Sequence, residues 1–387
     1  MIEYRVSSLV AALFLQTGTA LLAQCANTWQ STGGCAGVRA GAMAMATWDP
    51  DGGGPQSVGL VVGGSFRVAG SQIVNNIAWW NPQSASWHAL GGGLPGLGLG
   101  ANPPAAVVRA LAVMPNGELV AAGDLGAAGR IARWDGVTWS SIGGVINGAV
   151  TGLAVMPSGT LVAVGSFTEA GGVACSNVAE WSGTAWSPLG AGLSGSAYAC
   201  MTRPNGDLIV TGAFSAAGTV AAGNIARWNG AAWTPLGAGL GNWPVDAVYG
   251  YALAEWNGDL VVGGTSITPT TSAPALRRWD GTSWTVLLAP WTSSGWFVQG
   301  LTAMANGQLA VCGDFTLAGS PPSTGFATFD GANWQTLGGG LAAAGVGCRE
   351  VPGVGLVVAG RFQQIAGQQA GGMARWNGGQ WAPLAAP

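Results

Sequence analysis

The sequence has little charge and lacks residues that several functions require. Charged residues make up 7% of the 387 residues, lysine is absent, and His88 is the single histidine. One histidine cannot supply a two-histidine metal motif. The net charge is −3, and the thirteen arginines form no basic stripe of the kind that nucleic-acid binding needs. We therefore expect no nucleic-acid partner, no metal site and no cofactor.

Long apolar runs are also missing after residue 25, although hydrophobic residues make up 49% of the chain. No such run approaches the ~18 apolar residues of a membrane-spanning helix. Glycine is abundant, at 68 residues. We interpret this composition as many short strands that are buried on both faces, with no membrane span.

The first 24 residues have the pattern of a secretory signal peptide. Arg5 supplies a positive charge, residues 9–15 form an apolar core, and small residues such as Ala20 and Ala23 follow. We therefore expect a secreted or cell-envelope protein. The motif around Cys25 also allows a lipoprotein, although Gln24 is a poor residue before a lipidated cysteine.

Six cysteines in an exported chain predict disulfides. Cys200 and Cys348 occupy the same repeat position, and each follows a cysteine in the repeat before it. The predicted pairs are Cys175–Cys200, Cys312–Cys348 and Cys25–Cys35. The alternative is that these residues are buried free thiols.

One sequence pattern recurs seven times and ends on a tryptophan. The recurring residues are Trp87, Trp139, Trp186, Trp233, Trp284, Trp334 and Trp381, so the period is near fifty residues. A period of this length with several short apolar runs in each unit is typical of a closed radial array of β-sheets.

Each repeat divides into four strands joined by two hairpins. Asn-Gly or Asp-Gly pairs, as at residues 205–206 and 229–230, supply the positive φ that tight turns need. The sequence therefore predicts an all-β fold, a seven-bladed β-propeller of four-stranded antiparallel blades over residues 37–387. Residues 25–36 resemble a further outer strand.

A second aromatic precedes each of these tryptophans, as Trp134 precedes Trp139. With a two-residue turn the two rings would lie diagonally, and with a four-residue loop they would face each other. In either case they share one face of the sheet, where they can fill the gap between the outer strands of neighbouring blades.

These residues resemble kelch repeats and the galactose-oxidase type of propeller. The shared pattern is a glycine pair that ends the second strand, as at Gly263-Gly264, followed by an aromatic, Asp or Asn, and a tryptophan. Residues 165–171 with 177–181 are most similar to the propeller of the cortical cell-polarity-marker family. The resemblance implies the fold. The copper chemistry of galactose oxidase does not carry over, because His88 lies on an outer strand.

Candidate binding residues follow the second strands and the irregular connections. Asp124, Asp314 and Arg361 each follow the glycine that ends a second strand, and we expect these positions to ring the axis. Further aromatics lie outside the repeat pattern near blades 4–6, where they could bind a ligand or fill an irregular seam. They are Trp243, Tyr249, Tyr251, Trp291 and Trp296.

The sequence therefore favours an exported, non-catalytic binding or scaffold propeller. It would recognise a cell-surface glycan or protein through the loop face near blades 4–6. The first alternative is a carbohydrate-active hydrolase or lyase that uses the axial carboxylates of Asp124 and Asp314. The second alternative is a structural envelope protein without a soluble ligand.

Overall fold

The computed structural model describes residues 37–38, 41–94, 106–125, 129–241, 247–268, 271–287, 289–291, 295, 297–319 and 322–384. The chain divides into two units, residues 1–34 and residues 35–387, and every described residue belongs to the second. The expected signal peptide, the expected extra strand with Cys25 and Cys35, and the candidate residues Trp243 and Trp296 lie outside the described residues.

Seven four-stranded antiparallel sheets form a β-propeller, as the repeat predicts, and the described residues contain no helix. Blades 1–4 are β1 (Ala42–Trp48), β2 (Gly59–Gly64), β5 (Ile77–Asn81) and β6 (Ser86–Ala89); β7 (Val107–Val113), β8 (Leu119–Asp124), β9 (Ile131–Trp134) and β10 (Trp139–Ser141); β11 (Ala149–Val155), β12 (Leu161–Ser166), β15 (Val178–Trp181) and β16 (Trp186–Pro188); and β17 (Ser196–Thr202), β18 (Leu208–Ala213), β21 (Ile225–Trp228) and β22 (Trp233–Pro235). Blades 5–7 are β23 (Ala247–Trp256), β24 (Asp259–Ile267), β25 (Ser272–Trp279) and β26 (Trp284–Val286); β27 (Phe297–Ala303), β28 (Leu309–Leu317), β29 (Ser323–Phe329) and β30 (Trp334–Gln335); and β31 (Gly345–Val351), β32 (Gly355–Gly360), β35 (Met373–Trp376) and β36 (Trp381–Pro383).

The connection between the second and third strands differs among the blades. Blades 1, 3, 4 and 7 carry a small hairpin there: β3 (Val68–Ala69) with β4 (Gln72–Ile73), β13 (Glu169–Ala170) with β14 (Val173–Ala174), β19 (Ala216–Ala217) with β20 (Val220–Ala221), and β33 (Gln364–Ile365) with β34 (Gln368–Gln369). Blades 5 and 6 instead extend their second and third strands, and β24 and β28 each have nine residues.

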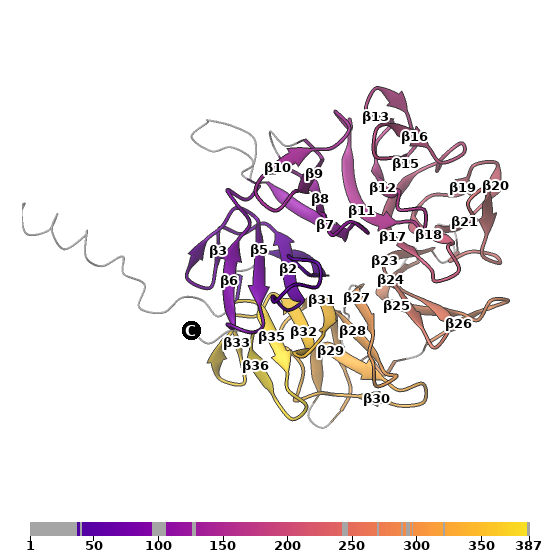
Figure 1. Ribbon diagram of the computed structural model, residues 1–387. Helices are drawn as coiled ribbons and strands as arrows, with labels where there is room; N and C mark the ends of the chain where they lie inside the picture. Colours follow the sequence, from indigo (N-terminus) through magenta and orange to yellow (C-terminus); the bar gives the residue numbers. More distant parts are fainter. Residues whose placement is uncertain are drawn as a thin grey trace, which may run out of the picture. The chain divides into compact units, whose positions relative to one another are not determined.

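The first strand of every blade lies next to the axis. Each first strand contacts the first strands of the blades before and after it, and β31 contacts β1 to close the ring. Figure 1 shows these strands gathered around the centre, with the blade of β35 and β36 beside that of β2 and β5. The second strands are almost fully buried because neighbouring blades cover both of their faces.

The aromatic pairs lie on the two outer strands, as expected, and their residues face each other directly. Trp134 pairs in register with Trp139, and the ring centroids are 5.4 Å apart. Four-residue loops therefore join these strands. In the loop that begins at Asp135, Gly136 alone has a positive φ, and the Asp135 carboxylate accepts the backbone N–H groups of Val137 and Thr138. The two-residue alternative is wrong because the aspartate side chain stabilises the longer loop.

The second tryptophan of a pair also links neighbouring blades. Its indole N–H donates to a leucine carbonyl of the preceding blade in four cases: Trp139 to Leu90 (3.1 Å), Trp233 to Leu189 (2.9 Å), Trp284 to Leu236 (2.8 Å) and Trp381 to Leu337 (2.7 Å). Each ring therefore adds one directed polar contact to the apolar packing between blades.

An apolar core between blades 7 and 1 closes the ring. It joins Leu60 and Trp87 of blade 1 to Val357, Met373 and Leu384 of blade 7, all at most 4% exposed. Blade 7 has its four strands from its own repeat. Among the described residues, side-chain packing therefore holds the two blades together.

The described cysteines are free thiols, so neither predicted disulfide among them is present. Cys175 packs in the core between blades 2 and 3, whereas Cys200 lies at the core between blades 3 and 4. The pair Cys175–Cys200 is corrected because Cys175 follows β14 of blade 3 whereas Cys200 lies on the first strand of blade 4, so the two side chains enter different cores. Cys312 and Cys348 do share one core, and burial together with the neighbouring Cys348 raises the pKa of Cys312 well above its usual value.

Candidate ligand-binding site on the axis

Every first strand contains one β-bulge, at the same place in each blade. One residue of each strand there has no partner on the second strand. These seven bulge residues are Met43, Arg109, Thr151, Tyr198, Tyr251, Gln299 and Val346. A bulge re-aims a side chain relative to its neighbours in the strand. The sevenfold repeat therefore directs seven different side chains toward one point on the axis.

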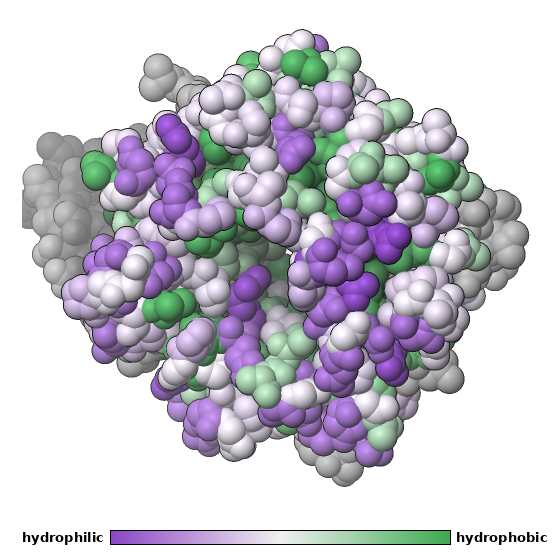
Figure 2. Space-filling view, turned by 45° about the vertical axis from the view of Figure 1, so that its right-hand side comes forward, coloured by the Kyte–Doolittle hydropathy of each residue, from purple (hydrophilic) through white to green (hydrophobic). Residues whose placement is uncertain are grey.

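All seven bulge residues line a cavity of about 360 Å³, here called the upper chamber, to which Arg361 also contributes. Ala42, Gly250 and Ala252 beside them are buried, whereas Met43 is 45% exposed and Tyr251 is 36% exposed. In the view of Figure 2 the surface is hollowed near the centre of the ring, and hydrophilic residues gather around the hollow. The chamber is thus an accessible site built from the first strands.

One side of the upper chamber is aromatic. The ring centroids of Tyr198 and Tyr251 are 5.4 Å apart, Tyr249 lies 6.4 Å from Tyr198, and Phe297 lies 6.2 Å from Tyr251. These four residues form the aromatic cluster. Burial raises the pKa of both Tyr198 and Tyr251, so their hydroxyls are neutral donors at physiological pH. Tyr249 also lines a hollow of about 440 Å³ over blade 4.

The other side of the upper chamber is cationic. Arg109 comes from blade 2 and Arg361 from blade 7, and these blades flank blade 1. Blades 4 and 5 lie across the ring from blade 1, so the arginines face the tyrosines. Asp124 forms an ion pair with Arg130 and lies 3.6 Å from Arg109, whereas Arg361 has no ion pair with a described residue. The chamber therefore offers rings on one wall and guanidinium groups on the other.

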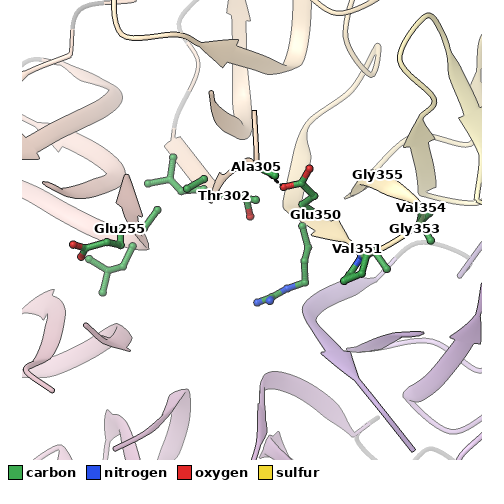
Figure 3. A pocket seen from close by; sticks show the side chains of 14 residues that line it. Glu255, Thr302, Ala305, Glu350, Val351, Gly353, Val354 and Gly355 are labelled. Atoms are coloured by element: carbon green, nitrogen blue, oxygen red, sulfur yellow. Dashed lines mark hydrogen bonds between the residues drawn. The ribbon is translucent and has the colours of Figure 1, made fainter. Parts of the chain in front are cut away.

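The cavity continues along the axis in two further parts. A waist of about 170 Å³ shares Met43, Tyr251 and Val346 with the upper chamber. A lower chamber of about 750 Å³ shares Leu253, Leu301 and Arg349 with the waist. Figure 3 shows the lower chamber, with Glu255 and Glu350 on different walls. Three adjoining cavities therefore follow one another along the axis.

The structure brings two of the candidate residues, Tyr251 and Arg361, into the upper chamber, and the Tyr249 ring lies 6.4 Å from that of Tyr198, which lines it. The expectation that Asp124, Asp314 and the equivalent positions ring the axis is corrected. Among these positions only Arg361 lines the upper chamber, because the second strands stand one strand away from the axis. Asp124 is neutralised by arginines, and Asp314, which pairs with Phe297, comes from blade 6.

Trp291 and His88 each pack against neighbouring aromatic rings. The Trp291 ring packs 4.7 Å from Phe315 and 5.9 Å from Trp334, and it joins the core of blades 5 and 6. Trp291 thus fills the irregular seam. His88 lies on the outer strand β6, where its ring stacks 5.2 Å from that of Trp79.

Sequence reasoning missed most of the bulge residues, although a signal was present. In every first strand the bulge residue varies, but the next residue is Ala or Gly: Ala44, Ala110, Gly152, Ala199, Ala252, Gly300 and Gly347. The small residue is required by close packing, since a Cβ added at Gly300 would lie 2.5 Å from Cys312 Sγ. A variable residue before an invariably small one marks the axial position.

No protein-family model and no curated protein matches the sequence. Solved structures with the same fold include the extracellular domain of a putative hybrid two-component system from B. thetaiotaomicron (TM-score 0.55, 8% identity), which covers 86% of this chain. The chain spans 38% of the length of that protein. A catalytically inactive virginiamycin B lyase from Staphylococcus aureus with quinupristin (TM-score 0.50, 15% identity) covers 83% of this chain and 92% of the lyase.

The WD40 β-propeller domain of Doa1 also has this fold, with a TM-score of 0.51 and 10% identity, over 85% of this chain and 94% of that domain. These similarities show a seven-bladed propeller. Membership of the kelch or cell-polarity-marker families stays a prediction. Among the described residues, no helix could cross a membrane, and no three His, Cys, Asp or Glu side chains are grouped to hold a metal ion.

Proposed function

We propose that this chain is an exported, non-catalytic binding propeller that takes a cell-surface glycan into the upper chamber. The observation that carries the proposal is the convergence of seven bulge side chains on one cavity, with the aromatic cluster facing two arginines. Tyrosine faces stack on the apolar faces of sugar rings, and arginines bind carboxylate or sulfate groups in a fork. A glycan with acidic substituents fits both walls.

The proposed site extends toward the loops of blades 4 and 5. Tyr249 lines the hollow over blade 4, and its ring lies 6.4 Å from that of Tyr198 in the upper chamber, so an extended ligand could reach from the axis toward these loops. Rigid scaffolds typically carry binding sites in this way. A protein segment with aromatic and acidic side chains is the second candidate ligand, because its groups would meet the same two walls.

The enzymatic alternative has less support. General acid–base catalysis needs two titratable groups within reach of one substrate atom. The carboxylates proposed for it, those of Asp124 and Asp314, come from blades 2 and 6, and neither lines the upper chamber.

A glycan array tests the proposal with chamber variants and a charge-matched control. The variants are Tyr251→Ala and Arg361→Ala. The control is Arg67→Ala, which removes an exposed arginine from the loop between the second and third strands of blade 1. We expect glycan binding that both chamber variants weaken about tenfold or more and the control retains, since charge-assisted hydrogen bonds contribute about 1.5–3 kcal/mol.

Two results would count against this function. Binding that the chamber variants retain would place recognition elsewhere on the molecule. Absence of glycan binding by the folded wild-type chain would remove the glycan as ligand, and peptides with acidic and aromatic residues would then be screened against the same variants.

A further inference from the structure

Arg349 lies where the waist meets the lower chamber. It lies on β31, the inner strand of blade 7, and lines both the waist and the lower chamber. The side chain is partly buried, and its surroundings in the waist include the apolar Met45, Leu253 and Leu301. Burial lowers the pKa of Arg349, but a guanidinium group stays charged at neutral pH. The junction of the waist and the lower chamber therefore contains a fixed positive charge in poorly solvated surroundings.

This charge has no partner among the described residues, because no hydrogen bond or ion pair joins the Arg349 guanidinium to them. The two carboxylates of the lower chamber are already engaged. Both oxygens of Glu255 accept hydrogen bonds from Arg203 at 2.8 Å, and Oε2 of Glu350 accepts the backbone N–H of Ala305 at 2.6 Å. Figure 3 shows the bond between Ala305 and Glu350 on one wall and Glu255 on another.

An unpaired charge in partly buried surroundings costs free energy unless a counter-ion offsets it. The lower chamber has room for one, with a volume of about 750 Å³. Its wall includes the turn with Gly353, where nothing lies within 4 Å of an added Cβ. Among the described residues of the chamber, Glu255 is paired with Arg203 and Glu350 holds the backbone of Ala305, and neither forms an ion pair with Arg349. A ligand can therefore supply the negative charge that Arg349 lacks.

We propose that the lower chamber is a second binding site, which takes an oxyanion of the phosphate or carboxylate type on Arg349. The planar guanidinium fork matches two oxygens of either group. The waist lies between the lower chamber and the upper chamber, so this site does not depend on the glycan-binding function.

The test is a titration of the full-length protein with inorganic phosphate and, separately, acetate at constant ionic strength. The readouts are the phosphorus NMR line width for phosphate and the thermal unfolding midpoint for both anions. Arg349→Gln removes the charge. Arg375→Gln is the matched control, because Arg375 is exposed and occupies the same row of the same sheet, on the other side of Val357.

We expect the wild type and Arg375→Gln to show a saturable response to at least one anion, and Arg349→Gln to lose it. Saturation separates binding from general stabilisation by excluded salts, which rises without limit. The anion that gives the response identifies the class of ligand. Without anion, Arg349→Gln should unfold at the same temperature as the wild type or higher, because an uncompensated charge has been removed.

The absence of a saturable response in the wild type, or an equal response in Arg349→Gln, would overturn the proposal. If Arg349→Gln does not fold, Arg349→Lys decides the question, because it keeps the charge and removes the fork. We expect that variant to bind about tenfold more weakly, the loss of one charge-assisted hydrogen bond, and an unchanged affinity would contradict the assignment.

Discussion

Burial of Cys200 on the inner strand β17 raises the pKa of its thiol to about 12. In the unfolded chain a cysteine ionises above about pH 8.5. The unfolded state therefore loses this proton first, and the free energy of unfolding falls as pH rises from about 8.5 toward 12. We predict that Cys200→Ala flattens this fall by up to about 1.4 kcal/mol per pH unit, the value for one proton. Urea unfolding at several pH values measures it.

The neighbouring Met201 provides the control for this experiment. Met201 packs against the core between blades 4 and 5 and does not titrate. Met201→Ala should lower the free energy of unfolding by a similar amount at every pH, because only packing is lost. An equal pH slope in Cys200→Ala and in the wild type would show that the thiol is already ionised, or accessible, in the folded state.

At the scale of the element, the outer strands offer a matched comparison of tryptophans. Trp139 donates its indole N–H to the carbonyl of Leu90 in the blade before it, whereas the buried indole N–H of Trp186 has no partner among the described residues. We predict that Trp139→Phe costs about 1 kcal/mol more in unfolding free energy than Trp186→Phe, because only the first loses a hydrogen bond. Equal losses would mean that the bond between blades contributes nothing.

The bulge of the first strand is the second element that can be tested. A Cβ at Gly300 would lie 2.5 Å from Cys312 Sγ and 2.8 Å from the Cα of Gly347. Gly300→Ala should therefore destabilise the protein by about 1–3 kcal/mol, the usual cost of overpacking. Gly92→Ala is the control, since nothing lies within 4 Å of its added Cβ. A neutral effect at Gly300 would show that blades 6 and 7 can separate slightly at the axis.

At the scale of the whole molecule, the seam between blades 7 and 1 should be as strong as the other seams. Leu384 of the closing core and Leu189 of blade 3 follow the same Trp-x-Pro pattern, and they are 1% and 2% exposed. We predict that Leu384→Ala and Leu189→Ala each cost about 2–5 kcal/mol, in a single unfolding transition. A separate early transition in Leu384→Ala alone would show that the ring opens at this seam.

Most of the fold could be predicted from the sequence, because a blade is a local structure. Its four strands are consecutive in the chain, its turns have turn chemistry of their own, and the Trp134–Trp139 pair lies within ten residues. The disulfide pairing could not be predicted. Cys175 and Cys200 are close in sequence, but Cys175 follows β14 and Cys200 lies on β17, and the core that each thiol enters depends on the packing of neighbouring blades.

The sequence by itself determined the number of blades, their strands and the aromatic pairs between them, because those features repeat with the period of the chain. Only the tertiary structure decided what the axis contains. Tyr198, Tyr251 and Arg109 are tens of residues apart, and they meet because the ring closes and because one unpaired residue in each first strand turns inward. Each blade contributes its bulge residue to the chamber, so the site exists only when all seven blades are assembled.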